Sequence, residues 1–166
     1  MAKNKYEQQA AAVQNEVVIH RVFDLPVDKV WRALTRPEEF RKWWGPNGFT
    51  CPYSKMEARV GGKYLNCMRG PDGKEFWSTG VVKEFKPREK LVLSDSFSDE
   101  HGNIRSASGD YGMPGDWPIE LLITFDLEEA DGATKLRVRH EGIPEEGHDD
   151  CVKGWNESLD KLEENI

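Results

Sequence analysis

The sequence predicts an α+β domain in which a curved antiparallel sheet packs against a long C-terminal helix. Three observations lead to this fold class. One strand-like segment is followed at once by two short helical segments, about six segments then alternate apolar and polar residues, and an amphipathic helical pattern closes the chain. Helices placed at the ends of a run of hairpins are typical of α+β domains rather than of alternating βαβ units.

The first elements are predicted from β-branched residues and from prolines. Residues 17–25, VVIHRVFDL, are dense in β-branched side chains and predict a strand. Pro26 suits the first turn of the helix that follows, and Pro37 ends that helix. A second short helix is expected over residues 38–44, since Gly45 and the proline after it form a stop signal.

The middle of the chain is predicted as a series of antiparallel strands. Its apolar residues recur with a period of two, and turn sequences such as GPDG and DG separate the alternating segments. The regular alternation from Ile119 to Leu127 places its apolar residues on one face of a strand. The predicted strands cover residues 51–59, 63–69, 75–85, 91–97, 117–127 and 134–140.

The last segment is predicted as an amphipathic helix that covers one face of the sheet. Its apolar stripe has helical spacing and consists of Val152, Trp155, Leu159, Leu162 and Ile166. Gly154 lies inside this helix at a cost of about 1 kcal/mol relative to alanine, which predicts a close approach of helix and sheet there. A curled sheet around one helix has a mouth, and ligand pockets favour such mouths.

The chain is expected to form a single domain over residues 15–166, preceded by an arm. Residues 1–14 are rich in Ala, Gln and Glu and predict a frayed helical or disordered arm. Residues 98–116 form a long glycine-rich connection between two strands. Loops of this length are either functional lids or mobile insertions, and both interpretations stay open.

The charge distribution argues against nucleic acid and membrane partners. The net charge of −7 resides in residues 141–166, which carry nine carboxylates and two lysines, while the charges of the remaining residues cancel. Such a chain has no basic surface for a phosphate backbone, and its acidic end would be repelled by anionic lipid. The sequence contains no run of about 18 apolar residues, so it predicts no membrane-spanning helix.

The cysteine and histidine patterns predict no metal and no cofactor. Cys51, Cys67 and Cys151 show no CxxC or other ligand spacing, and an odd number of cysteines argues against a disulfide framework. Free thiols suit a reducing compartment, and the first residues lack the apolar stretch of a secretory signal. We therefore expect a cytoplasmic protein.

The segment RKWWGPNG contains two adjacent tryptophans immediately before a turn. Neighbouring side chains on a helix point about 100° apart, so Trp43 and Trp44 cannot both face one core. We expect one to plug the gap between the short helices and the sheet and the other to border a cavity. In the alternative, both only seal the end of the sheet.

Aromatic residues and one histidine are the candidate walls of this cavity. His140 is in phase with Leu136 and Val138, so it is expected on the side of the sheet that faces the C-terminal helix. There it either contacts a ligand or forms hydrogen bonds within the core. Glu57, Asp95 and Glu120 are all possible carboxylate partners of His140, and their spacing does not choose among them. The sequence contains no catalytic motif, so no residue is predicted to be catalytic. The candidate ligand-binding residues are Trp43, Trp44, Phe49, Trp77, Phe97, His140 and Trp155.

Three segments resemble a known family. They are VFDLPVDKVWRALTRPEEFRKWWGPNGF, VGGKYLNCMRGPDG and HEGIPEEGHDDCVKGWNESLDKL, and they are similar to proteins related to the C-terminal domain of the heat-shock protein 90 ATPase activator. That family lies within the START-like (SRPBCC) helix-grip superfamily. The resemblance implies a β-α-α-β6-α order, a seven-stranded antiparallel sheet wrapped around the C-terminal helix, and an internal cavity between them.

Three functions are compatible with these features. The favoured one is non-enzymatic binding of a small apolar or aromatic ligand between the sheet and the C-terminal helix. The family resemblance implies an alternative, a chaperone-associated interaction module. A further alternative is an enzyme of cyclase or hydrolase type that uses His140 with a nearby carboxylate, which ranks last because the sequence shows no assembled nucleophile and base.

Overall fold

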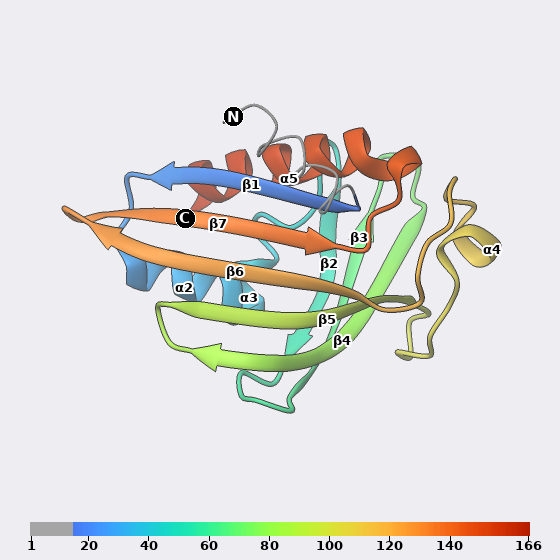
Figure 1. Ribbon diagram of the computed structural model, residues 1–166, viewed down its shortest axis with the longest axis horizontal. Helices are drawn as coiled ribbons and strands as arrows, with labels where there is room; N and C mark the ends of the chain where they lie inside the picture. The colour runs from blue at the N-terminus through green and yellow to red at the C-terminus, as the bar shows by residue number, and fades with distance from the viewer. Residues whose placement is uncertain (1–14) are drawn as a thin grey trace, which may run out of the picture.

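The computed structural model describes residues 15–166 as a seven-stranded antiparallel sheet arched over a C-terminal helix (Figure 1). The predicted arm, residues 1–14, lies outside the described residues. The strands are β1 (Glu16–Phe23), β2 (Thr50–Met56), β3 (Lys63–Arg69), β4 (Glu75–Lys86), β5 (Lys90–Ser98), β6 (Leu121–Ala130) and β7 (Ala133–Glu141). The helices are α2 (Val27–Thr35), α3 (Pro37–Phe40), α4 (Ala107–Tyr111) and α5 (Glu145–Asn165).

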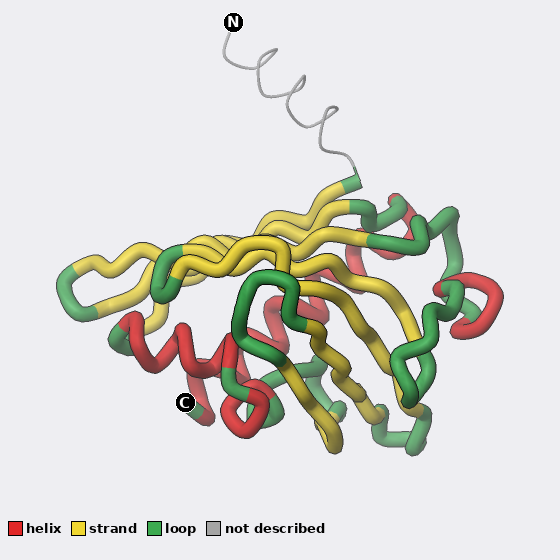
Figure 2. The backbone as a smooth tube through the Cα atoms, turned by 90° about the horizontal axis from the view of Figure 1, so that it is seen from below, coloured by secondary structure: helices red, strands yellow, loops and turns green. Residues whose placement is uncertain are grey.

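The strand order confirms the predicted α+β helix-grip fold. Across the sheet the order is β1-β7-β6-β5-β4-β3-β2, so only β1 pairs with a strand distant in sequence. This pairing brings the first strand beside the strand that leads into α5. Figure 2 shows α2, α3 and α5 on the concave side of the arched sheet, while α4 lies beyond the ends of the strands.

The core forms where the apolar stripe of α5 meets the inner face of the sheet. Trp155, Leu159 and Leu162 of the predicted stripe are buried, and Val152 and Ile166 pack partly buried against the core. Opposite them, the alternating residues of the central strands are buried: Leu91, Leu93, Ile123, Phe125, Leu136 and Val138. Removing such side chains from water supplies about 1.5–3 kcal/mol each, which holds the helix on the sheet.

Trp43 closes the end of this core. Its side chain is fully buried, and its Nε1–H donates a hydrogen bond of 2.8 Å to the carbonyl of Ala33 at the end of α2. The next residue, Trp44, is only partly buried and meets the Trp43 ring edge-on with a centroid distance of 5.7 Å. The two indoles therefore have different environments. The helix α3 ends at Phe40, and a turn carries the chain on to Trp43.

The predicted strand over residues 117–127 begins too early. The structure starts β6 at Leu121, and Ile119 is 56% exposed instead of sharing the inner face. Pro118 has no N–H to donate to a ladder, and Asp95 is paired with Leu121 at the end of the β5–β6 register. The predicted strand over residues 51–59 also ends early, at Met56, because the chain then turns toward Gly61 and Gly62.

The long connection after β5 is folded rather than extended. Ser106 caps α4 by accepting a hydrogen bond from the N–H of Asp110, and Gly112 ends the helix with a φ of 68°. The Tyr111 hydroxyl donates to the carbonyl of Ser98 and accepts from the N–H of Trp77. These contacts dock the connection on the ends of β4 and β5.

Two glycines, one tightly enclosed in the sheet and one on α5, test the packing of the core. On β4, a Cβ at Gly80 would lie 1.9 Å from the carbonyl oxygen of Ser94 and 2.6 Å from the Tyr64 ring. We predict that Gly80→Ala lowers the free energy of unfolding by about 1–3 kcal/mol through overpacking, as measured by urea denaturation.

Gly154→Ala is the matched control. The close approach predicted at Gly154 is wrong, because a Cβ there would meet no atom within 4 Å. Alanine should therefore raise the free energy of unfolding by up to about 1 kcal/mol through its higher helix propensity. An equal loss of stability in both variants would contradict this packing.

Candidate functional site

A cavity of about 230 Å³ lies between α5, the sheet and the connection that follows β5. Gly147, Cys151, Gly154 and Ser158 recur along one face of α5 and form its ceiling. The other lining residues are Trp44, Gly45, Pro46, Met68, Phe76, Trp77, Ser78, Asp95, Phe97, Met113, Trp117, Leu121, His140, Ile143, Asp150 and Trp155.

Five of the seven predicted wall residues meet at this cavity. They come from the α3–β2 connection, from β4, β5 and β7, and from α5, and they are Trp44, Trp77, Phe97, His140 and Trp155. Trp43 does not line the cavity, because it is enclosed in the core. Phe49 does not line the cavity either: it is partly buried and lines a second hollow, on the other side of the turn after Gly45.

Several lining residues were missed by the sequence analysis. Cys151 precedes Trp155 by one helical turn, so the helical spacing from Trp155 was a signal that could have found it. Met113 comes from the connection after β5, where no periodicity indicates a direction, and Trp117 was predicted at the start of a strand that begins only at Leu121. Trp117 packs on the backbone of α5: a Cβ at Gly147 would lie 2.5 Å from its ring.

Trp155 ties the helix to the walls of the cavity. Its ring meets Trp44 edge-on at a centroid distance of 5.4 Å and Phe125 at 5.8 Å. Edge-to-face geometry of this kind adds about 0.5–1.5 kcal/mol to the free energy of burial. On the other side of the cavity, Trp117 meets Phe97 in the same manner at 6.0 Å.

A hydrogen-bonded chain of polar groups forms one end of the cavity. Nε2 of His140 lies 3.0 Å from Oδ2 of Asp95, so Asp95 is the carboxylate partner that the sequence left open. The Tyr64 hydroxyl is shared between Oδ1 of Asp95 and the carbonyl of Ser94, both at 2.9 Å. The Nε1–H of Trp155 donates to Nδ1 of His140 at 3.1 Å.

Asp95 and Trp155 act on the protonation of His140 in opposite directions. Burial lowers the pKa of His140, whereas the hydrogen bonds with Asp95 and Cys151 and the charge of Asp95 raise it; these influences, without the Trp155 donor, place the pKa at about 9. The indole N–H can only donate, however, so it requires Nδ1 to be unprotonated. We assign the neutral ring with its proton on Nε2 as the resting form, because a proton on Nδ1 would have to displace the indole donor that lies 3.1 Å away.

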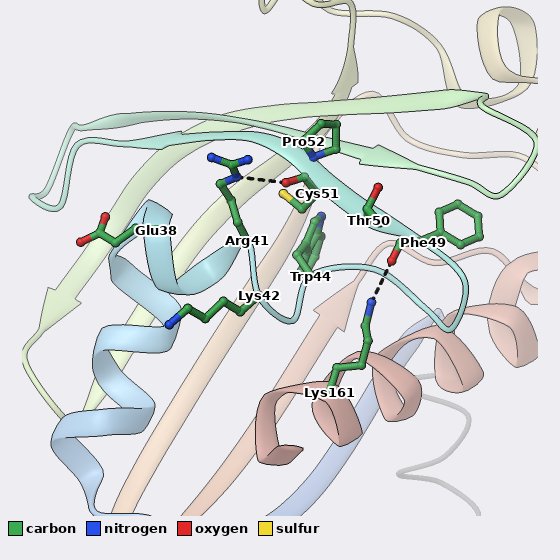
Figure 3. Close-up of a pocket in the computed structure, with 9 residues that line it drawn as sticks. All are labelled: Glu38, Arg41, Lys42, Trp44, Phe49, Thr50, Cys51, Pro52 and Lys161. Atoms are coloured by element: carbon green, nitrogen blue, oxygen red, sulfur yellow. Dashed lines mark hydrogen bonds between the residues drawn. The ribbon is translucent and has the colours of Figure 1, made fainter. Parts of the chain in front are cut away.

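A second hollow, of about 510 Å³, lies outside the α3–β2 connection (Figure 3). Its three cations already have partners: Lys161 donates to the carbonyls of Phe49 and Pro46, Arg41 donates to that of Cys51, and Lys42 pairs with the Glu39 carboxylate. Burial lowers the pKa of Lys161. Because these cationic groups already have partners, they offer few free donors to a ligand. We therefore take the aromatic cavity under α5 as the candidate site.

Other kinds of site find no support in the part of the chain that the structure describes. Within residues 15–166, no cluster of three His, Cys, Asp or Glu side chains is arranged to hold a metal ion. None of the helices there has the length and apolar character required to cross a membrane.

The opposing effects on His140 can be separated by two substitutions. We predict that Trp155→Phe raises the pKa of His140 relative to the wild type, since it removes the donor that opposes protonation at Nδ1. Asp95→Asn should lower the pKa, since it removes the charge that favours the imidazolium. NMR titration of the ring protons measures both shifts, and identical titration curves for the wild type and Trp155→Phe would contradict the assigned tautomer.

Comparison with known proteins supplies the context for this site. The family model described as activator of Hsp90 ATPase homolog 1-like protein matches residues 24–166. The search among curated proteins found no match to the chain.

Solved structures share the fold. Protein CV1439 from Chromobacterium violaceum is 29% identical, with a TM-score of 0.75 over 91% of this chain and 96% of that chain. Protein Ms6760 from Mycobacterium smegmatis is 19% identical, with a TM-score of 0.75 over 93% of this chain and 92% of that chain. The AHSA1 protein SPO3351 from Silicibacter pomeroyi is 20% identical, with a TM-score of 0.67 over 90% and 95%. The family model spans most of the length of this chain, and the solved structures share its sheet-and-helix architecture. The chain therefore belongs to the activator of Hsp90 ATPase homolog 1-like family.

Proposed function

We propose that this protein binds a small aromatic or apolar molecule in the cavity under α5. The observation that carries the proposal is the convergence of indole and phenyl rings from separate elements on one space, with a polar chain at a single end. Burial of a ligand's apolar surface supplies the free energy of binding, at about 25 cal/mol per Å², and the polar end fixes its orientation.

The size of the cavity limits the ligand. A volume of about 230 Å³ lies below the range of roughly 300–1,000 Å³ that holds drug-sized molecules. It exceeds the roughly 150 Å³ of an apolar cavity that binds benzene. We therefore expect ligands with one or two rings, or aliphatic molecules of similar volume.

The polar end selects a ligand with one hydrogen-bonding group. Asp95 and His140 are 17% and 12% exposed, so few water molecules compete for their remaining hydrogen-bonding capacity. A hydroxyl placed there can donate to the carboxylate of Asp95. An apolar body with a single hydroxyl thus fits better than a ligand that is polar throughout.

The chaperone-associated alternative is supported by the family description alone, and no feature of the described surface favours it over ligand binding. A cytoplasmic location remains part of our proposal. It is supported by the three free cysteines, which suit a reducing compartment.

Gly154 offers a direct way to fill the site. A side chain at this position would extend into open space that borders the cavity. We predict that 1-naphthol, a two-ring compound with one hydroxyl, changes the tryptophan fluorescence of the wild type saturably. Gly154→Leu should weaken this binding at least about tenfold, or 1.4 kcal/mol, because leucine occupies the space of the ligand.

Lys153→Leu is the control, since residue 153 is exposed on the same helix and outside the cavity. It adds the same apolar side chain without filling the site, so its affinity should equal that of the wild type. The proposal fails if one- and two-ring compounds give no saturable signal, or if both leucine variants bind as the wild type does.

A further inference from the structure

Cys151 extends the polar end of the cavity into a series of three reactive groups. Its Sγ lies 3.7 Å from Nδ1 of His140, and Nε2 of that ring lies 3.0 Å from Oδ2 of Asp95. A thiol beside an imidazole, with a carboxylate behind the imidazole, is the arrangement in which a nucleophile, a base and an orienting group act together. All three side chains line the cavity.

The other cysteines lack these features. Burial raises the pKa of the Cys51 thiol to about 11 and that of the Cys67 thiol to about 12, which suppresses the nucleophilic thiolate. Both are buried, whereas Cys151 is partly exposed. The chain thus carries two internal controls for the reactivity of Cys151.

Trp155 restrains the base. Its indole N–H already donates to Nδ1 of His140 at 3.1 Å, the same nitrogen that the thiol of Cys151 faces. The lone pair of Nδ1 is therefore shared between Trp155 and Cys151. Loss of the indole N–H would free this lone pair for the thiol proton.

We propose that Cys151 is a nucleophile that adds to a small conjugated carbonyl compound held in the cavity, with His140 as its proton acceptor and Asp95 as a positioning residue. The inference rests on the proposed function, because the electrophile occupies the same aromatic cavity. An enone fits this chemistry, since its planar conjugated system can pack against the indole rings and its β-carbon reacts with a soft sulfur nucleophile.

The addition is balanced without a further reactant. The proton of the Cys151 thiol passes to Nδ1 of His140, and the thiolate sulfur forms a bond to the β-carbon of the enone. The electron pair of the carbon–carbon double bond moves toward the carbonyl and gives an enolate. The imidazolium then returns the proton to the α-carbon, which leaves a saturated thioether and a neutral His140.

Asp95 favours the imidazolium formed in the first step. Tyr64 donates to the other oxygen of Asp95 and holds that carboxylate in place. Asp150 of α5 also lines the cavity and adds a second negative charge there. Both carboxylates favour a proton that stays on His140 over one released to solvent.

Benzylideneacetone, an aromatic enone, and its saturated analogue benzylacetone form a matched pair of probes. Intact-protein mass spectrometry with peptide mapping measures adduct formation by the enone, and tryptophan fluorescence measures binding of the analogue. We expect one adduct, on Cys151, formed about tenfold or more faster than any adduct on Cys51 or Cys67. Cys151→Ser should abolish it.

Two further variants separate an activated thiol from a merely accessible one. His140→Gln should slow the addition by about tenfold or more, since general base catalysis is lost. Trp155→Phe should accelerate the addition, because Nδ1 of His140 is freed for the thiol proton. If circular dichroism shows that His140→Gln is unfolded, the rate of Trp155→Phe alone tests whether His140 activates the thiol. An unchanged rate in folded His140→Gln, or in Trp155→Phe, overturns the inference.

The analogue distinguishes failure of this inference from failure of the proposed function. If benzylacetone binds saturably while the enone leaves Cys151 unmodified, the reactive thiol is overturned and the binding function stands. If neither probe binds and Cys151 is unmodified, both are overturned.

Discussion

The contact of Trp155 with the sheet is the interaction on which the rest of the structure depends. Its ring packs edge-on against Phe125 and Trp44, and its N–H bonds to His140. A buried indole needs a partner for its N–H, and here the partner is the imidazole that Asp95 orients from β5. One side chain thus fixes the position of α5, the tautomer of His140 and one wall of the cavity.

The cavity follows from the unequal size of the residues along α5. Beyond Trp155 toward the C-terminus, Leu159 and Leu162 fill the space between helix and sheet. Beside this stripe, the face of α5 that lines the cavity carries small residues, among them Gly147 and Gly154, and of these two glycines only Gly147 is covered by a packed ring. Native cores contain few voids, and an open space lined by aromatic rings is typical of a ligand-binding site.

Periodicity was sufficient to predict the fold and part of the site. The alternation of the strands and the stripe of α5 located the core, and His140 was placed on the inner face by its phase with Leu136 and Val138. Its pairing with Asp95 was only one of several possibilities, because contacts between distant strands leave no signal in spacing. Trp117 was predicted in a strand, but it lies in an irregular segment before β6 and docks on a helix distant in sequence, a contact that alternation does not reveal.

The family shares this architecture at low sequence identity, so the site must be judged by its own chemistry. The central claim is that the space beside Gly154 and Trp155 accepts an apolar guest. A crystal structure determined under xenon pressure tests this most directly, because xenon enters dry apolar cavities without needing a polar contact. We predict a xenon peak between these two residues and the rings of β4 and β5. A space that excludes xenon, or is filled by a rearranged side chain, would contradict it.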